Sequence, residues 1–336
     1  MQLKPIREQV VAVVGASSGI GRETALRFAQ QGAKVTIAGR SEAKLASVAE
    51  EIRRFGGEVV VAIADVTEFE QVKAIAQTTV ATYGRLDTWV HLPATAVIAL
   101  FEETTPEEFQ RVIDVSLMGQ VYGAMAALPY LKQEGRGALI HVSSMEGRRS
   151  LPLQSAYAAA KHGVEGFLES LRVELMHQNI PISVTGIQPA VINTPFWNNA
   201  RTRIGVKPAG IPPYYDPRLV ADAILYTAEH PTRDFIVGDA GRILDGLQRL
   251  SPSLVDRLLL WFGFPLQRSQ QPKSEDDPNN LYEPVPTQTR VDGDYTDAVI
   301  PSVSDWLAKQ PLVQLGAIAG LVTVAVLAAQ PWNSKE

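Results

Sequence analysis

Three side chains within residues 144–161 have the types and the spacing for a proton transfer. Tyr157 and Lys161 are four positions apart in a stretch with helical periodicity, so they share one face of a helix. A tyrosine with a pKa of about 10 is a poor base at neutral pH, but the Lys161 ammonium is expected to favour its ionised form. Ser144 precedes Tyr157 by 13 positions, at the end of a predicted strand. Its hydroxyl would orient the substrate oxygen with which Tyr157 exchanges a proton.

A glycine-rich turn follows the first apolar run of the chain. The stretch "VVGASSGIGRE", residues 13–23, contains Gly15, Gly19 and Gly21. It is not a P-loop, because no Gly-Lys-Ser/Thr follows. Taken alone, it also fits an ordinary turn between a strand and a helix. At the carboxyl edge of a parallel sheet, however, such a turn lets a pyrophosphate approach the N–H groups of a helix N-terminus.

The elements that must position these residues alternate along residues 8–245. Short β-branched runs predict strands at 10–14, 34–38, 59–64, 86–92, 138–142, 182–188 and 235–237. Helical periodicity predicts helices at 19–31, 42–55, 69–83, 106–133, 155–178 and 217–229. Apolar strands joined by helical crossovers pair in parallel. The pattern predicts an α/β fold with a doubly wound, Rossmann-like, mostly parallel seven-stranded sheet.

The glycine turn and the Ser-Tyr-Lys set together resemble the short-chain dehydrogenase/reductase family. The family's Thr-Gly-x-x-x-Gly-x-Gly appears as "VGASSGIG", with Val14 in place of the threonine. The resemblance implies an oxidoreductase that binds a nicotinamide cofactor and interconverts a carbonyl and an alcohol. It assigns catalysis to Ser144, Tyr157 and Lys161, and implies that Lys161 also holds the nicotinamide ribose hydroxyls.

The resemblance also assigns the cofactor contacts. They are Gly15, Ser17, Ser18, Ile20, Gly21, Arg40, Asp65, Val66, Tyr157, Lys161, Ile192 and Thr194. Arg40 follows the second strand, and no carboxylate occupies positions 36–41. An arginine suits the 2′-phosphate of NADP(H), whereas a carboxylate would bind the ribose hydroxyl of NAD(H), so NADP(H) is favoured. The alternatives are a surface role for Arg40 and a turn-capping role for Asp65.

Two positions depart from the family pattern. Ser116 replaces an asparagine that the family uses to hold a water linking the lysine to solvent, and we expect Ser116 to serve a modified relay. The Asn-Asn-Ala-Gly that usually ends the fourth strand is His91-Leu92-Pro93-Ala94 here. Pro93 removes a backbone donor. His91 is predicted to pack or to hydrogen-bond rather than to act as an acid or base.

Residues 195–215 indicate the substrate class. This segment is poor in helix signals and rich in aromatic side chains, and in the family it covers the substrate. An apolar carbonyl or alcohol is therefore expected; packing of the aromatics within the domain is an equal alternative.

The net charge of −5, without runs of Lys or Arg, argues against a nucleic-acid partner. The absence of cysteine excludes disulfides and thiolate chemistry. No metal site is expected. The protein is expected to form a homo-oligomer.

The composition changes after a predicted oxidoreductase domain at 1–268. Residues 269–310 contain five prolines, eight acidic and three basic residues, which predicts a solvated, flexible linker. The apolar run 312–329 would span ~27 Å as a helix, close to the ~30 Å core of a bilayer. We therefore expect a transmembrane helix at 311–332, with a buried core helix as the alternative. The catalytic domain would face the cytoplasm. The apolar run 258–266 would lie on the same membrane or on the domain.

Three functions compete. The first is an NADP-dependent oxidoreductase tethered to a membrane. The second is a catalytically idle NADP-binding regulatory module at a membrane, which the departures at Ser116 and 91–94 would fit. The third is a membrane scaffold whose sheet domain is only structural. The intact Ser144, Tyr157 and Lys161 favour the first function.

Overall fold

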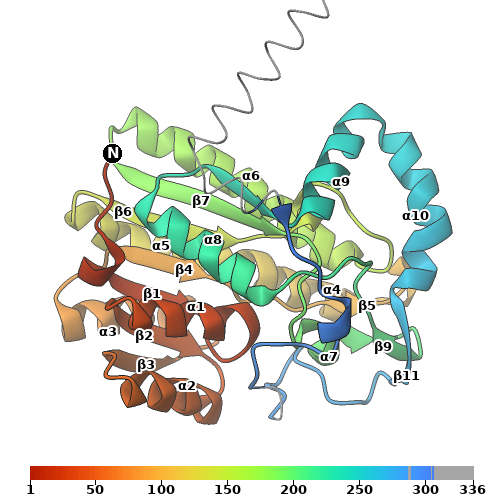
Figure 1. The fold of residues 1–336 in the computed structure, drawn as a ribbon, viewed down its shortest axis with the longest axis horizontal. Helices are drawn as coiled ribbons and strands as arrows, with labels where there is room; N and C mark the ends of the chain where they lie inside the picture. The colour runs from red at the N-terminus through yellow and green to blue at the C-terminus, as the bar shows by residue number, and fades with distance from the viewer. Residues whose placement is uncertain (287–288, 304, 306–336) are drawn as a thin grey trace, which may run out of the picture.

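The fold is known from a computed structural model that describes residues 1–286, 289–303 and 305 (Figure 1). The transmembrane helix predicted at 311–332 lies outside the described residues. Within them, one helical stretch, Pro106–Gln133, is long and apolar enough to cross a membrane, but half of its most apolar window is buried inside the protein. Its second part, Gly119–Gln133, packs on one face of the central sheet.

The predicted seven-stranded parallel sheet is confirmed. Its order is β10-β7-β6-β4-β1-β2-β3. The strands are β1 (Val10–Val14), β2 (Lys34–Gly39), β3 (Val59–Ile63), β4 (Thr88–His91), β6 (Gly137–Val142), β7 (Ile182–Pro189) and β10 (Asp234–Val237). The order runs outward in opposite directions from β1 and β4, which pair directly. Ligands bind such sheets at this switch point, beyond the carboxyl ends of the strands.

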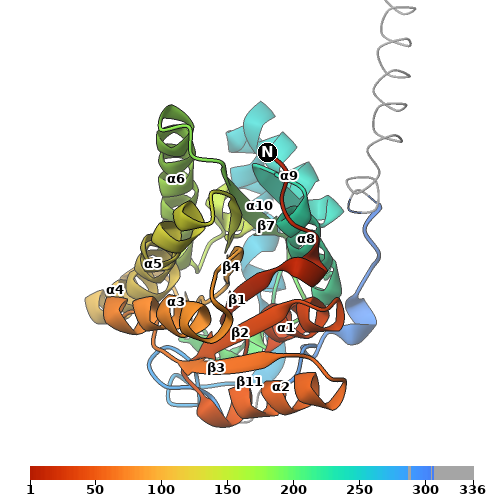
Figure 2. The ribbon, with the colours of Figure 1, turned by 90° about the vertical axis from the view of Figure 1, so that its left-hand side faces the viewer.

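Helices cover both faces of the sheet (Figure 2). On one face lie α1 (Gly19–Gln30), α2 (Glu42–Arg54) and α8 (Pro217–Glu229). On the other lie α3 (Phe69–Tyr83), α5 (Gly119–Gln133) and α6 (Ser155–His177). Each face has its own apolar core, built from the buried strands and the apolar stripe of the helices.

The helix predicted at 106–133 has an irregular middle. It consists of α4 (Pro106–Ile113), a π-helical turn η3 (Asp114–Met118) and α5. Thr105 caps α4: its hydroxyl accepts from the Glu108 N–H, and the Glu108 carboxylate accepts from the Thr105 N–H. Such π turns are frequent at functional sites, and this one carries Ser116.

The remaining elements gather beyond the carboxyl ends of the strands. The helices among them are α7 (Phe196–Asn199), α9 (Asp239–Leu250) and α10 (Pro252–Leu266). The strands are β5 (Val97–Ile98), which pairs with β8 (Arg201–Thr202), and β9 (Val206–Pro208), which pairs with β11 (Arg268–Pro272). The single turns are η2 (Phe101–Glu103), η4 (Met145–Gly147) and η5 (Thr296–Ala298), whereas η1 (Ile6–Glu8) precedes β1 at the amino end of that strand. The sequence pattern did not predict these short strands.

The acidic, proline-rich segment packs on the domain, so the predicted solvated, flexible linker is wrong for its described part. We call residues 273–286, 289–303 and 305 the C-terminal strap (blue in Figure 1). Its carboxylates meet basic side chains of the domain, as in the pairs Asp292–Arg218 and Asp294–Lys207. These pairs join residues far apart in the chain, so composition alone could not reveal them.

Candidate active site

The glycine turn joins β1 to α1 at the carboxyl edge of the sheet. Gly15 and Gly19 have φ of +90° and +56°, the left-handed conformation that favours glycine. At Gly21, a Cβ would lie 2.1 Å from the carbonyl oxygen of Gly15, so no side chain fits. Gly21 therefore lets α1 pack directly on the glycine turn, and the first residues of α1 line a groove.

This groove, of about 220 Å³, runs past the ends of β1, β2, β3 and β4. Its wall contains most of the predicted cofactor contacts: Gly15, Ser17, Ser18, Ile20, Gly21, Arg40, Asp65, Val66 and Thr194. The other predicted contacts, Tyr157, Lys161 and Ile192, line a cavity of about 430 Å³. The groove and the cavity share lining residues, among them Ile20 and Thr194, so the two adjoin.

Arg40 and Asp65 stand at the far end of the groove. The Arg40 guanidinium donates to the backbone oxygens of Asn280 and Tyr282, at 2.9 and 2.5 Å. The Asp65 carboxylate accepts from the Thr67 N–H at 3.0 Å and from Arg111 at 3.0 Å. Asp65 thus caps a turn, as the alternative interpretation held, and also lines the groove.

The three predicted catalytic side chains lie together in the wall of the cavity. Ser144 follows β6, and its hydroxyl accepts from the Glu146 N–H at 3.1 Å. Tyr157 and Lys161 project from the first turns of α6. The Lys161 ammonium donates to the Val142 oxygen at 2.9 Å and lies 5.5 Å from the centroid of the Tyr157 ring. β6 and α6 therefore place the proton-transfer groups on one surface.

The electrostatics of the pair differ from the sequence-based expectation. Burial raises the pKa of Tyr157 above its ordinary value, and the Glu146 carboxyl adds to this, while a hydrogen bond with Ser144 acts in the opposite direction. Burial lowers the pKa of Lys161 to about 8. The sequence predicts that the Lys161 ammonium lowers the pKa of Tyr157 and so favours the phenolate. In the structure, burial has the larger effect on this pKa, because a buried site penalises every charged form.

Ser116 makes contacts that differ from those expected of a water relay. Its hydroxyl is fully buried in η3, accepts from the Thr95 N–H at 3.0 Å and donates to the Thr95 oxygen at 3.1 Å. The hydroxyl is thus engaged with the loop after β4 in both directions. Ser116 thus fixes that loop, and its part in a water relay stays a prediction.

His91 packs in the interior, as predicted. Its ring stacks on that of His141, and its Nδ1 accepts from the Trp89 indole N–H at 3.4 Å. Burial lowers the pKa of His91 well below its ordinary value. A neutral, buried ring without a path to the cavity is a packing residue.

The cavity is mostly apolar. Phe196, Trp197 and Ile211 come from the segment predicted to cover the substrate, and Leu244, Leu247 and Leu259 come from α9 and α10. The aromatics Tyr214 and Tyr215 of the same segment do not line the cavity: the Tyr214 ring stacks on Tyr295 of the C-terminal strap, and the Tyr215 hydroxyl accepts from the Ala240 N–H. Part of segment 195–215 therefore lines the cavity and part packs elsewhere, and the substrate class stays a prediction.

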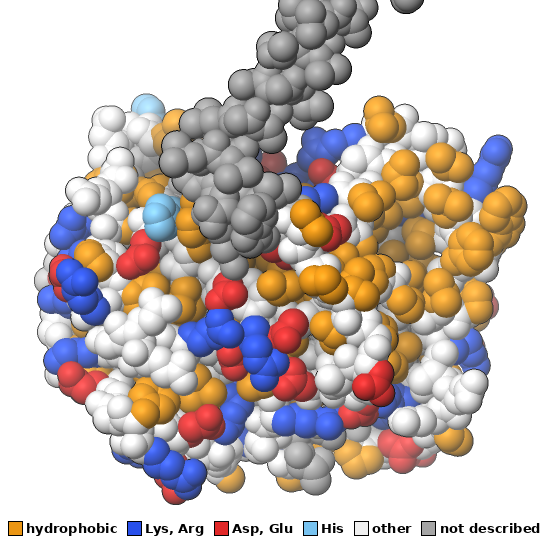
Figure 3. All heavy atoms as spheres, viewed as in Figure 1, with side chains coloured by type: hydrophobic (Ala, Val, Ile, Leu, Met, Phe, Trp, Pro, Cys, Tyr) orange, Lys and Arg blue, Asp and Glu red, His pale blue; other side chains and the backbone are white. Residues whose placement is uncertain are grey.

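The outer faces of α9 and α10 carry exposed apolar side chains. They form the hydrophobic region over these helices in Figure 3. Its most exposed members are Ile243, Leu250, Leu260, Trp261 and Phe262. The run 258–266 therefore does not pack wholly on the domain: Leu259 lines the cavity while its neighbours face outward.

Sequence reasoning missed two residues of the site. Glu146 lines the cavity, and burial raises the pKa of its carboxyl to about 8. Its Oε2 atom is buried with no hydrogen-bond partner among the described residues. An acidic residue two positions after Ser144 was a local signal for it. Asn280 lines the groove from the C-terminal strap, and nothing in its local sequence marks it.

Comparisons with known proteins agree on the nature of the sheet domain. The profile of the short chain dehydrogenase family matches residues 9–205. The uncharacterized oxidoreductase YxnA of Bacillus subtilis is 36% identical over 336 residues, which covers 97% of this chain and 92% of the relative. The 3-oxoacyl-[acyl-carrier-protein] reductase FabG of Thermotoga maritima is 32% identical over 244 residues, 71% of this chain and 97% of the relative.

One solved structure supports the same likeness. A 3-ketoacyl-ACP reductase from Sinorhizobium meliloti 1021 has 29% sequence identity and a TM-score of 0.62, and the match covers 70% of this chain and 99% of that one. The match to the Bacillus subtilis relative covers nearly the whole chain and therefore includes the C-terminal strap. Among the described residues, no three His, Asp or Glu side chains are grouped in a way that could hold a metal ion.

Proposed function

Because the chain belongs to the short-chain dehydrogenase family, we propose that it is an NADP(H)-dependent oxidoreductase that interconverts a carbonyl and an alcohol on an apolar substrate. The observation that carries this proposal is the position of Ser144, Tyr157 and Lys161 in the wall of an apolar cavity that adjoins the glycine-lined groove.

The groove fits a dinucleotide at its phosphate end. Gly21 lets the first turn of α1 pack directly on the backbone of the glycine turn, and the N-terminus of α1 at the groove suits a pyrophosphate. Ser17 and Ser18 offer hydroxyls beside it. When bound, the nicotinamide supplies or accepts the hydride. Ile192 and Thr194, at the boundary of groove and cavity, would hold the nicotinamide end.

Arg40 supports NADP(H) over NAD(H). It lines the groove at the end of β2, where the ribose 2′ position would lie. Each terminal nitrogen of its guanidinium donates one hydrogen bond to the strap. Since each of these nitrogens carries two N–H groups, the guanidinium can still donate to a phosphate oxygen.

The charge distribution supports a proton-donor role for Tyr157. Burial and the nearby Glu146 raise the pKa of Tyr157, so its hydroxyl keeps its proton over the physiological range. A protonated tyrosine serves carbonyl reduction, in which the phenol gives its proton to the substrate oxygen as hydride arrives at the carbon. Ser144 would hold the same oxygen. We therefore propose reduction as the favoured direction.

The cavity supports an apolar substrate with one additional polar group. Most of its wall is aliphatic or aromatic, which matches an apolar body. A pKa of about 8 leaves the Glu146 carboxyl protonated at neutral pH. A neutral carboxyl can donate a hydrogen bond, so Glu146 would bind a hydroxyl or carbonyl of the substrate.

We also propose that residues 311–332 anchor the protein in a membrane with the domain on the cytoplasmic side. Support comes from the length and hydropathy of that stretch in the sequence. The exposed apolar side chains of α9 and α10, next to the cavity, are a second support, because contiguous exposed apolar surface suits a lipid interface.

The experiment is turnover by the full chain with a panel of apolar aldehydes and ketones, each with NADPH and with NADH. Reduction with NADPH supports the proposal. Binding of NADPH without turnover of any carbonyl would favour the idle module. For the anchor, alkaline carbonate should leave the full chain in the membrane pellet and release a chain that ends at Val303.

A further inference from the structure

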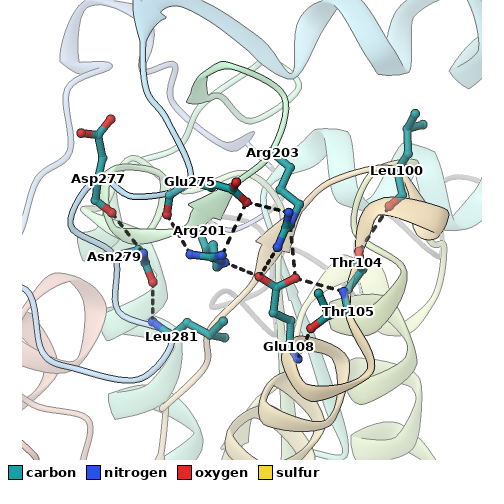
Figure 4. Close-up of polar contacts among 10 residues, drawn as sticks. All are labelled: Leu100, Thr104, Thr105, Glu108, Arg201, Arg203, Glu275, Asp277, Asn279 and Leu281. Atoms are coloured by element: carbon teal, nitrogen blue, oxygen red, sulfur yellow. Dashed lines mark hydrogen bonds and ion pairs between the residues drawn. The ribbon is translucent and has the colours of Figure 1, made fainter.

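The C-terminal strap runs along the open side of the cofactor groove. It is held at its start by an ionic cluster on α4 (Figure 4). The buried Glu108 carboxylate bonds to Arg201 and, at 3.1 Å, to Arg203. Arg203 in turn pairs with Glu275 of the strap at 2.6 Å. A few residues on, Leu281 is fully buried. The strap is thus fixed beside the groove by ion pairs and by apolar packing.

The middle of the strap forms part of the groove wall. Asn280 lines the groove, and its Oδ1 accepts from the Thr95 hydroxyl at 3.0 Å. The Thr95 backbone is the part that Ser116 holds with two hydrogen bonds. The backbone oxygens of Asn280 and Tyr282 accept hydrogen bonds from the Arg40 guanidinium. The side chain expected to meet a 2′-phosphate is therefore oriented by the strap.

The later part of the strap reaches the phosphate end. The Gly19 N–H, at the start of α1, donates to the Arg290 oxygen at 3.0 Å. Asp292 forms a two-point pair with Arg218, at 2.8 and 3.1 Å. Gly293 donates its N–H to the Asn193 oxygen beside Thr194, which lines the groove. The strap therefore contacts the groove at its phosphate end as well as at its Arg40 end.

The size of the groove indicates that this closure matters. Sites for small molecules and cofactors usually enclose roughly 300–1,000 Å³, whereas the groove measures about 220 Å³. Asn280 of the strap is one of the lining residues, so the strap contributes to this narrow cross-section.

We propose that residues 280–282 and 290–293 of the strap are a further wall of the cofactor site, which orients Arg40 and must detach for the cofactor to enter or leave. The proposal rests on the proposed function, since it takes a nicotinamide dinucleotide as the ligand. It adds that the strap controls the rate of cofactor exchange. A strap that only stabilises the fold would leave that rate unchanged.

The absence of cysteine allows a direct test. A Thr95→Cys/Asn280→Cys double variant of the full chain places two thiols where the native side chains are in contact. The protein is loaded with NADPH, oxidised, and mixed with excess NADP⁺ while the nicotinamide fluorescence is followed. We expect NADPH to dissociate about tenfold more slowly or slower still from the oxidised form than from the same protein after dithiothreitol, since the closed wall governs release.

A second variant keeps the test decisive if the disulfide does not form. Asp292→Ala removes one anchor of the strap, its ion pair with Arg218, and we expect NADPH to dissociate severalfold faster. Glu50→Ala is the matched control, because it removes an arginine–carboxylate pair on α2, away from the strap. The thermal midpoint shows that both are folded.

The outcomes separate the two proposals. Equal release rates from the oxidised and reduced forms, or from Asp292→Ala and Glu50→Ala, overturn the strap proposal while leaving the cofactor intact. Failure of the unaltered chain to bind either NADPH or NADH overturns the proposed function itself.

Discussion

The two ends of the site are built in different ways. The catalytic end comes from one strand and the next helix, so Ser144, Tyr157 and Lys161 lie within a short stretch of chain. The adenosine end is assembled from the ends of β2 and β3, from α4 and from the C-terminal strap. For example, the Arg40 guanidinium donates to the backbone oxygen of Tyr282, which is 242 positions away in the chain. The comparison teaches that the proposed chemistry and the proposed cofactor selection lie in separate parts of the molecule, which variants should separate.

Tyr157→Phe should have the largest effect. The ring and its packing remain, but the exchangeable proton is lost, so kcat should fall by about 10²–10⁴. The Kd for NADPH, measured by fluorescence titration, should stay within threefold of the parent value. A variant that retained at least a tenth of parental turnover would remove Tyr157 from the proton step.

Arg40→Ala should act on the other end. A hydrogen bond to a charged group contributes about 1.5–3 kcal/mol, so the NADPH-over-NADH affinity ratio should fall about tenfold or more. Turnover at saturating cofactor should change little. Equal affinities of the parent chain for the two cofactors would show that Arg40 does not select between them. An equal loss of turnover would show that the two ends are not separate.

Glu146→Gln sharpens the description of the catalytic end. Burial raises the pKa of Glu146 to about 8 and lowers the pKa of Lys161 to about 8. Above pH 8 the carboxyl therefore ionises and the ammonium loses its charge, so kcat/KM for reduction should fall as pH rises through this value. The glutamine variant removes one ionisation and should show a shallower fall. Glu50→Gln is the control, and identical profiles would exclude Glu146 from the pH response.

Ser116→Ala should have the smallest effect. It removes two hydrogen bonds to the Thr95 backbone and leaves buried polar groups unpaired, so unfolding free energy should fall by about 1–3 kcal/mol. Denaturant unfolding measures that loss. Turnover should stay within threefold, because the hydroxyl is engaged with Thr95. A larger loss of turnover at unchanged stability would restore the water relay expected from the sequence.

The sheet and the catalytic end could be predicted because their signals are local. Buried β-branched runs identified the seven strands, and the spacing of Tyr157 and Lys161 followed from helix geometry. The Ser116 contacts could not be predicted, because they depend on a π turn and on the backbone of a loop from another element. The raised pKa of Tyr157 could not be predicted either, since it depends on how deeply the ring is buried.

The adenosine end was the least predictable part. Arg40 was correctly placed at the groove, but its two strap partners were not foreseen. An acidic, proline-rich composition indicates a solvated segment only when the folded domain offers no basic side chains with which the carboxylates can pair. Here Arg203, Arg218 and Lys207 lie where the strap carboxylates reach them. The membrane anchor, the oligomeric state and the cytoplasmic location stay predictions.

The strap also orders the events of folding. Its bonds to Arg40 and Gly19 close very long loops. Such contacts form late, because the chain must lose the entropy of loop closure before the contacts can stabilise it. During synthesis, chains fold from their N-terminal side. The strands through β10 can pair while the strap is still being made. A nascent chain would therefore complete the sheet with Ser144, Tyr157 and Lys161 first, and would gain the strap only in the last stage of its synthesis.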